Sequence, residues 1–278
     1  MLDQITPLIL TFNEAANITR TLDQLTWASK IVVVDSFSDD ETLEILRRYP
    51  QVRLLQREFT SFADQCNYGL KSNEITTEWV LNLDADYVLT KELVNELRNL
   101  TPTDSVAGYR TRFIYCIHGK KIRSGIYPPV TTLFRRRSAE FFPDGHAHRV
   151  RIKGVVAPLR EAILHDDRKS LRRWLQSQAT YAEKEALKLR TSKSNSLTWT
   201  DKLRKLRVVT PVVMPFYCLL LKGGILDGWP GVYYALQRTL AELLLSLDLL
   251  GRTLEPEASV RAPQEELTPQ LNIQRTKI

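Results

Sequence analysis

Four short runs of apolar, strand-forming residues, each followed by a helical pattern, constrain the fold most strongly. The runs cover 6–12, 31–35, 52–55 and 79–83. The helical patterns follow at 14–26, 39–49, 61–72 and 90–100. The runs are continuously apolar, as in Ile31-Val-Val-Val34, which is typical of strands buried on both faces. We therefore expect a parallel sheet between two layers of helices, as in nucleotide-binding α/β folds.

Helix-start signals precede three of these helical patterns. Asn13 and Asp39 precede the first two, and Ser61 precedes the third with Asp64 three residues later, in the spacing of a capping box. We expect these residues to begin the helices.

The second part of the chain has a different texture. Short extended pieces alternate with turn residues at 108–117, 120–124, 131–136 and 148–153. They predict an antiparallel or mixed portion. The expected organisation is a nucleotide-binding half over 1–100, a second half of the same domain over 101–168, C-terminal helices over 169–252 and a flexible tail over 253–278.

Charge is divided unevenly along the 278 residues. Residues 1–100 hold 9 basic and 16 acidic side chains, whereas residues 110–173 hold 16 basic and 5 acidic ones. The basic half is consistent with a solvated face or with an anionic ligand or membrane surface.

The three cysteines are far apart and fit a reducing compartment, and the N-terminal residues do not resemble a signal peptide.

Two apolar segments lie near the C-terminus. The first, 208–221, is shorter than the ~20 residues that span a bilayer and contains Pro211 and Pro215. The second, 232–250, has an apolar helical face. Both segments fit either packing on the main domain or docking at a membrane surface, which the basic residues at 202–207 would assist. We favour docking without spanning.

Carboxylates follow two of the buried strands. Asp84 and Asp86 lie two residues apart, so in an extended chain they would face the same point, at the carboxyl end where α/β sheets bind ligands. Two such carboxylates repel unless a cation lies between them, and oxygen ligands favour Mg²⁺ or Mn²⁺. Asp35 ends another strand and could bind a ribose or a base edge. The sequence contains neither Gly-x-Gly-x-x-Gly nor Gly-x-x-x-x-Gly-Lys, which disfavours dinucleotide and P-loop sites.

Taken in order, four motifs resemble those of the family-2 glycosyltransferases, which have the GT-A fold. The motifs are Leu10-Thr-Phe-Asn-Glu14, Val33-Val-Asp-Ser-Phe-Ser-Asp39, Phe62-Ala-Asp-Gln-Cys-Asn67 and Asn82-Leu-Asp-Ala-Asp86. Leu164-His-Asp-Asp167 and the segment 223–228 look like the subgroup that builds lipopolysaccharide core or lipid-linked glycans.

The resemblance implies a role for each matching residue. The donor-binding residues would be Thr11, Phe12, Asn13, Glu14, Asp35, Gln65 and Asp84. Asp86 would bind the metal, with Asp84 and His165 as further ligand candidates. In the acceptor half the family usually has a carboxylate as general base, and Asp144 in the turn sequence Pro143-Asp-Gly145 is the candidate here.

The implied function is inverting transfer of one sugar from a nucleotide-diphosphate sugar, most readily a UDP-sugar, with Mg²⁺ or Mn²⁺. The expected acceptor is an amphiphilic, phosphorylated lipid-linked glycan or lipopolysaccharide core, reached from the cytoplasmic face of the membrane; no nucleic acid is expected as a partner. Transfer to polyprenyl phosphate is the nearest alternative. A nucleotidyltransferase and a non-catalytic basic membrane-binding module are more distant ones.

Overall fold

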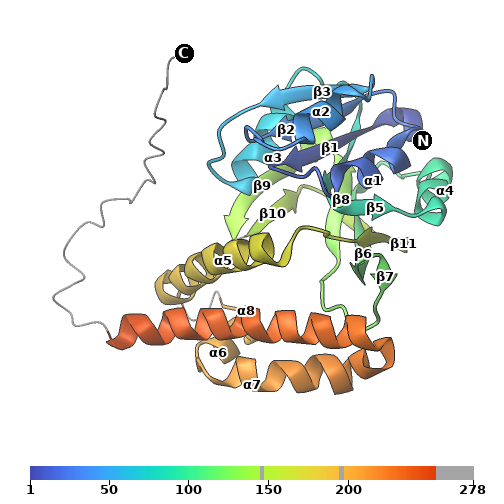
Figure 1. Cartoon of the computed structure of the whole chain (residues 1–278). Helices are drawn as coiled ribbons and strands as arrows, with labels where there is room; N and C mark the ends of the chain where they lie inside the picture. The colour runs from blue at the N-terminus through green and yellow to red at the C-terminus, as the bar shows by residue number, and fades with distance from the viewer. Residues whose placement is uncertain (145–146, 194–196, 255–278) are drawn as a thin grey trace, which may run out of the picture.

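A computed structural model describes residues 1–144, 147–193 and 197–254. Of the predicted tail, 255–278 lies outside the described residues. The described chain forms a layered α/β unit, with a group of C-terminal helices beneath it in Figure 1.

A mixed sheet forms the centre of the α/β unit. Its parallel part has the order β3-β2-β1-β4. These strands are β1 (Ile5–Thr11), β2 (Ile31–Asp35), β3 (Val52–Gln56) and β4 (Trp79–Asp84). The predicted parallel sheet is therefore confirmed.

The sheet continues beyond β4 in the order β8-β6-β11-β5. β8 is antiparallel to both β4 and β6, β6 is parallel to β11, and β11 is antiparallel to β5. The strands are β5 (Tyr87–Leu89), β6 (Val106–Ile117), β8 (Val130–Arg135) and β11 (Val155–His165), and the short β7 (Lys120–Lys121) pairs with β6. A separate antiparallel hairpin consists of β9 (Ala139–Asp144) and β10 (Ala147–Ile152). The mixed second half is thus confirmed.

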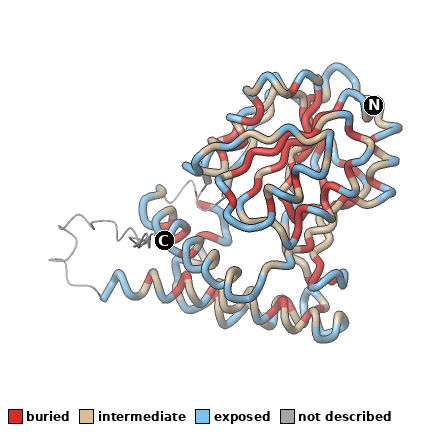
Figure 2. Tube along the Cα trace, turned by 45° about the horizontal axis from the view of Figure 1, so that its top comes forward, coloured by how far each residue is buried: buried red, intermediate tan, exposed pale blue. Residues whose placement is uncertain are grey.

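Helices cover both faces of the parallel strands. One apolar cluster joins one face of the sheet to α1 (Ile18–Leu22), α2 (Thr42–Arg47) and α4 (Lys91–Asn99). The other cluster joins the opposite face to α3 (Phe62–Lys71) and the β9–β10 hairpin. Alternate residues of each strand enter the two clusters, and β1, β2 and β4 are among the most deeply buried parts of the described chain (Figure 2).

The helix starts differ from expectation at two of three places. Ser61 caps α3 as predicted, since its side chain accepts a hydrogen bond from the Asp64 backbone. α1 and α2, however, begin later than Asn13 and Asp39. Asn13 has a φ of 56°, and its side chain accepts a hydrogen bond from the Asp39 backbone at 2.8 Å. These two residues therefore join the loops after β1 and β2 instead of beginning helices.

The C-terminal helices have one side packed and one side exposed. They are α5 (Leu171–Thr191), α6 (Trp199–Arg204), α7 (Val209–Phe216), the π-helical turn η5 (Tyr217–Leu221), the 3-10 turn η6 (Gly224–Asp227) and α8 (Trp229–Leu254). Apolar clusters join α8 to α5 and to the β6–β7 region. Within the described residues, no helix combines the length and apolarity needed to cross a bilayer.

Two glycines allow η6 and the start of α8 to approach closely. A Cβ atom at Gly231 would overlap the carbonyl oxygen of Gly224, and a Cβ at Gly224 would lie 2.7 Å from the carbonyl oxygen of Cys218. Asp227, between them, accepts hydrogen bonds from the Ser124 backbone and hydroxyl at 3.1 and 3.0 Å. This junction attaches the C-terminal helices to the loop after β7.

We predict that Gly231→Ala destabilises the chain by about 1–3 kcal/mol, because the new methyl group cannot fit without moving backbone. Urea unfolding followed by circular dichroism measures the change. Gly251→Ala is the matched control in the same helix, since a Cβ there meets nothing within 4 Å. The control should be neutral or stabilising by up to about 1 kcal/mol, and equal destabilisation of both variants would contradict the prediction.

Candidate active site

The carboxyl ends of β1, β2 and β4 meet at one edge of the sheet. The strand register pairs Thr11 with Asp35 and Leu10 with Asp84. The polar residues that follow three separate apolar runs are therefore neighbours, as expected for the ligand edge of an α/β sheet.

Asp35 joins the first two strands at this edge. It is fully buried. One carboxylate oxygen accepts hydrogen bonds from the hydroxyls of Thr11 at 2.8 Å and Ser38 at 2.5 Å, and the other accepts from the Ser38 backbone at 2.8 Å. In this structure Asp35 holds the ends of β1 and β2 together through Thr11 and Ser38. Its direct contact with a nucleoside stays a prediction.

Gln65 is also buried and also joins loops. Its side-chain amide donates to the hydroxyl of Ser36 at 3.1 Å and to the backbone carbonyls of Arg57 and Glu58 at 3.2 and 3.0 Å. Its Oε1 atom is buried without a hydrogen-bond partner. Gln65 thus supports the edge from α3, and its contact with donor stays a prediction.

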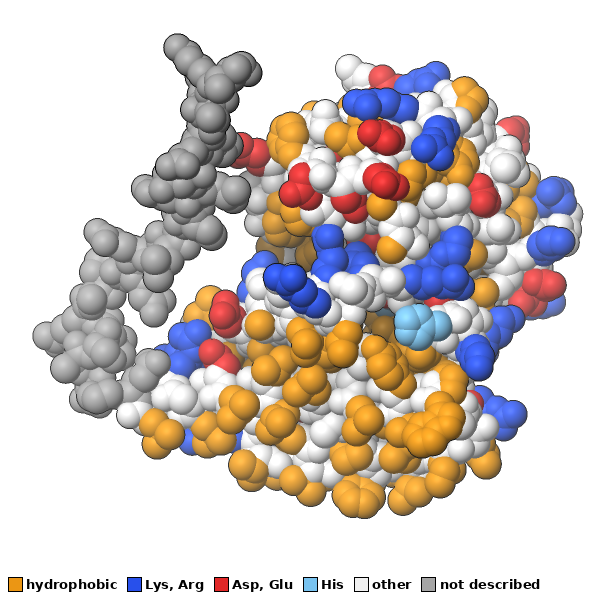
Figure 3. Space-filling model, in the orientation of Figure 1, with side chains coloured by type: hydrophobic (Ala, Val, Ile, Leu, Met, Phe, Trp, Pro, Cys, Tyr) orange, Lys and Arg blue, Asp and Glu red, His pale blue; other side chains and the backbone are white. Residues whose placement is uncertain are grey.

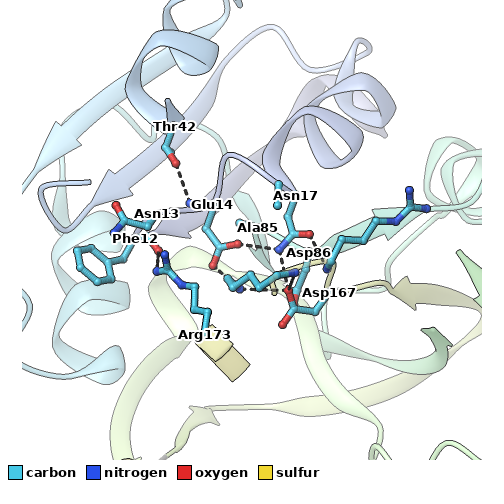
Figure 4. Close-up of polar contacts among 12 residues, drawn as sticks. Phe12, Asn13, Glu14, Asn17, Thr42, Ala85, Asp86, Asp167 and Arg173 are labelled. Carbon is cyan, nitrogen blue, oxygen red and sulfur yellow. Dashed lines mark hydrogen bonds and ion pairs between the residues drawn. The ribbon is translucent and has the colours of Figure 1, made fainter. Parts of the chain in front are cut away.

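Phe12 projects from the edge and is 51% exposed. The Arg173 guanidinium lies over it, with Cζ 5.6 Å from the ring centroid and a 2.9 Å hydrogen bond from Nη2 to the Phe12 carbonyl oxygen (Figure 4). An exposed aromatic ring with a cation beside it can stack on a base and attract phosphate. α5 thereby adds a residue to the edge.

A polar network joins the loop after β1 to the segment after β11. Glu14 accepts a hydrogen bond from the Asn17 amide at 2.9 Å and pairs with the Lys169 ammonium at 2.8 Å. Asn17 also donates to Asp167 at 2.9 Å. Figure 4 shows Glu14, Asn17, Asp86 and Asp167 pointing toward one another.

Lys169 is the cation of this network. Burial by itself lowers the pKa of Lys169, but the charges of Glu14, Asp86 and Asp167 outweigh burial and raise it. Burial raises the pKa of Glu14 in spite of the opposing ammonium. The network therefore holds a positive charge beside Asp86.

Asp86 is paired with His165. The β4–β5 turn carries Asp86, and β11 pairs with β5 so that His165 lies opposite Tyr87. The distance from Nε2 of His165 to Oδ2 of Asp86 is 3.2 Å. Burial would raise the pKa of Asp86, but the charge and hydrogen bond of His165 outweigh it and hold this pKa at about 2. Asp86 is therefore ionised at neutral pH.

Three tyrosine rings surround the imidazole. The ring centroids of Tyr115, Tyr127 and Tyr87 lie 4.7, 4.9 and 5.2 Å from that of His165. Burial lowers the pKa of His165, but the carboxylates of Asp86 and Asp84 raise it to a net value above 6.5. Nδ1 of this imidazole is buried without a hydrogen-bond partner.

The roles of Asp84, Asp86 and His165 as metal ligands stay a prediction. Asp84, Asp86 and His165 are neighbours, yet in the described part of the chain no three His, Cys, Asp or Glu side chains are arranged to hold a metal ion. The remaining carboxylate oxygens are the hard donors that Mg²⁺ and Mn²⁺ prefer, and Mg²⁺ usually completes its shell with water and substrate phosphate.

The candidate base Asp144 ends β9, where it pairs with Ala147 of β10. Its side chain, like Gly145 and His146, lies outside the part of the chain that the structure describes. The catalytic role of Asp144 stays a prediction.

The arginine run 135–137 has a structural role at two of its positions. Arg135 pairs with Glu78 and covers the Trp79 ring, with Cζ 4.7 Å from the centroid. Arg136 donates to the backbone carbonyls of Leu70, Ser72 and Ile75.

Comparison with known proteins gives the family. Residues 8–152, more than half of the chain, match the family described as "Glycosyl transferase family 2". The chain belongs to this family. The matched region contains the ligand edge and the β9–β10 hairpin, whereas His165, Lys169 and Arg173 follow it.

The relatives of this family-2 chain match over about half of their own length. An "Uncharacterized glycosyltransferase" of Rickettsia bellii is 28% identical over 145 residues, which are 50% of this chain and 48% of that protein. The "Lipopolysaccharide core biosynthesis glycosyltransferase LpsC" of Rhizobium meliloti is 30% identical over 109 residues, 37% of this chain and 39% of that protein.

Among solved structures, S. aureus TarS in complex with UDP has a TM-score of 0.43 at 14% identity, covering 90% of this chain and 92% of that chain. Glucosyl-3-phosphoglycerate synthase from Mycobacterium tuberculosis has a TM-score of 0.43 at 14% identity, covering 66% and 80%. Both likenesses are weak.

Lys169 and Asn17 are site residues that the sequence did not reveal. Lys169 belongs to a run of charged residues, Asp166-Asp-Arg-Lys169, that directly follows the apolar end of β11. That position at a strand end is the signal that could have found Lys169. Asn17 carried no signal, because the contact that joins it to the segment after β11 is with Asp167, 150 positions away.

We predict that Asp86→Asn lowers the pKa of His165. Burial lowers this pKa, and the substitution removes the negative charge of Asp86 that raises it. Histidine NMR titration in the presence of EDTA measures this pKa, with Asp3→Asn as a control because the Asp3 side chain is 88% exposed.

A histidine whose pKa is raised by folding contributes stability that is lost as pH rises through its folded pKa. The stability lost in Asp86→Asn should therefore be larger at about pH 6 than at about pH 9. An unchanged or higher His165 pKa would contradict the pairing.

Proposed function

We propose that this chain carries out inverting transfer of one sugar from a nucleotide-diphosphate sugar to a lipid-linked glycan or lipopolysaccharide-core acceptor. The observation that carries the proposal is the acidic end of β4, where Asp84 and Asp86 lie at the ligand edge of a family-2 sheet. A UDP-sugar is the favoured donor, as the sequence motifs imply.

The donor would bind across the ends of β1, β2 and β4. Phe12 would stack on the base, and Arg173 beside it would bind the phosphates. Thr11 and Asp35 would lie next to the ribose. Asn13, Glu14 and Gln65 keep the surrounding loops in place through the contacts described above. Lys169 supplies positive charge near the diphosphate.

The oxygens of Asp84 and Asp86 fit a divalent cation that is shared with the substrate, and Mg²⁺ or Mn²⁺ is the proposed cofactor. Such a cation stabilises negative charge on the leaving phosphate. His165 keeps Asp86 ionised and oriented, so that no proton competes for the carboxylate at neutral pH. In this proposal His165 is a positioning residue instead of the third metal ligand that the sequence suggested.

Asp144 is the proposed general base. It would take the proton of an acceptor hydroxyl as that hydroxyl attacks the anomeric carbon from the face opposite the diphosphate. Its place on the hairpin of β9 and β10, next to α3, is compatible with the acceptor side of the site.

Several observations favour an amphiphilic, phosphorylated acceptor. The region 110–173 is strongly basic, and the C-terminal helices expose apolar side chains. A relative in Rhizobium meliloti is named for lipopolysaccharide core biosynthesis. Transfer to polyprenyl phosphate is the second candidate, since attack by a phosphate oxygen hardly needs a base. Both acceptors place the enzyme at the cytoplasmic face of a membrane.

We predict that Asp86→Asn reduces sugar transfer by about 10²–10⁴-fold, because several kcal/mol of charge stabilisation on the leaving phosphate would be lost. Thermal shift with UDP, with and without Mn²⁺, should show a Mn²⁺-dependent increase in melting temperature for the unaltered chain. This increase should disappear in Asp86→Asn and persist in the control Asp3→Asn. Unaltered Mn²⁺ dependence in Asp86→Asn would contradict the proposed site.

We predict that Asp144→Asn slows transfer to a hydroxyl acceptor by roughly 10²–10⁴-fold and leaves the UDP affinity unchanged. Initial rates with a panel of UDP-sugars and lipid-linked acceptors, together with calorimetric UDP titration, measure both quantities. Full transferase activity in Asp144→Asn would show that the base is another residue, or that the acceptor is a phosphate.

A further inference from the structure

The C-terminal helices carry a large exposed apolar surface, which we call the docking face. Its members are Leu206, Val208, Val212, Val213, Phe216, Leu220, Leu221, Ile225, Leu226, Trp229, Leu236, Leu243 and Leu247. Figure 3 shows hydrophobic side chains gathered over this part of the molecule, whereas charged side chains gather above it. A continuous apolar surface of this kind marks a binding site for a protein or a membrane.

The docking face includes the outer side of α8. Leu236, Leu243 and Leu247 are spaced by seven and four residues, which places them on one side of a helix. Tyr234 and Leu245, on the other side, are buried against the β6–β7 region and α5 respectively. The main domain therefore covers only the inner side of the helix.

Charge on the docking face has one sign. Between 206 and 254 the acidic side chains are Asp227, Glu242 and Asp248, and none of them is exposed. Each binds a partner: Asp227 binds Ser124, Glu242 pairs with Arg204 at 2.6 Å, and Asp248 pairs with Arg252 at 3.0 Å. The exposed charged residues in this described stretch are Lys222 and Arg252, and Arg252 is the partner of Asp248. The surface therefore offers apolar groups and the positive charge of Lys222.

A basic cavity adjoins the docking face. It has a volume of about 800 Å³, and its lining includes Lys120, Lys121, Arg123 and Asp227, together with Leu226 and Trp229 of the docking face. Oδ1 of Asp227 lies 4.0 Å from Nε of Arg123, so Lys120 and Lys121 supply the excess positive charge. Lys120, Lys121 and Arg123 are exposed. Cationic side chains beside exposed leucine and tryptophan are the combination that binds the phosphate and acyl-chain boundary of a bilayer.

We propose that the docking face binds an anionic phospholipid bilayer, with its apolar side chains in the acyl boundary and the basic cavity on the lipid phosphates. The proposal rests on the proposed function, because a lipid-linked acceptor is presented at such a surface. A bilayer matches this mixture of apolar and basic groups, whereas a second copy would bring the same basic groups against themselves.

The cavity lies close to the proposed sugar-transfer site. Tyr115 lines the cavity, and its ring centroid lies 4.7 Å from that of His165, the partner of Asp86. Tyr115 therefore belongs both to the lining of the cavity and to the aromatic rings around His165. A lipid-linked acceptor held by its phosphate in the cavity would reach the site without leaving the membrane surface.

Vesicle flotation of the full chain tests the proposal. We expect the unaltered chain to bind vesicles of phosphatidylcholine and phosphatidylglycerol more tightly than vesicles of phosphatidylcholine alone, and high salt should weaken this binding. The double variant Leu221→Glu/Trp229→Glu, whose target residues are 79% and 84% exposed, should lose about tenfold or more in partitioning. Lys120→Glu/Lys121→Glu should lose the preference for phosphatidylglycerol.

Val155→Glu is the matched control, because Val155 is 55% exposed on β11 of the main domain and lies outside the docking face. It should float like the unaltered chain. Calorimetric UDP titration of every variant separates this proposal from the proposed function, since donor binding in water needs no membrane.

Three outcomes would overturn the proposal. The first is a chain that binds UDP but does not float with either kind of vesicle, and the second is equal flotation of the double variant. The third is a dimer in sedimentation velocity that Leu221→Glu/Trp229→Glu converts to a monomer without any vesicle binding, which would make the face a contact between copies. Loss of UDP binding by the unaltered chain would instead contradict the proposed function.

Discussion

The segment from His165 to Lys169 holds the site together. It begins with the last residue of β11 and contacts two different loops of the first hundred residues. His165 pairs with Asp86 on the β4–β5 turn, and Lys169 pairs with Glu14 after β1. Burial disfavours the charged form of each of these groups, and the opposite charge of its partner offsets that cost. The ligand edge therefore depends on contacts between residues far apart in the sequence, and the first half of the chain cannot form it alone.

This dependence explains the division of charge along the chain. The first hundred residues carry the acidic groups of the edge, and the basic region that follows supplies their partners and the guanidinium of Arg173 over Phe12. Part of the net positive charge serves the fold, as Arg136 shows by binding backbone carbonyls between α3 and β4. The remainder, including Lys120 and Lys121, is exposed and available to anions. A net charge alone does not separate these two uses.

The sequence predicted the parallel strands and their ligand edge well, because continuous apolar runs have few other interpretations. It did not predict the short strand β5 or the full length of β11, whose pairing depends on distant residues. The carboxylates were identified, but the extended-chain argument for Asp84 and Asp86 neglected the turn after β4, and Asp86 binds His165 instead. Burial of Asp35 and Gln65 could not be foreseen either, since a polar residue after a strand looks the same whether it faces a ligand or supports a loop.

The loop after β7 is attached on both of its sides. Asp227 binds Ser124, the Tyr234 hydroxyl accepts a hydrogen bond from the Ile126 backbone at 3.1 Å, and the Tyr127 hydroxyl lies 2.7 Å from that of Tyr87. The C-terminal helices and the aromatic wall of the site thus share one short connector. Anyone building chimeras between family members would have to transplant this connector together with the helices, because neither part keeps its hydrogen-bond partners when exchanged separately.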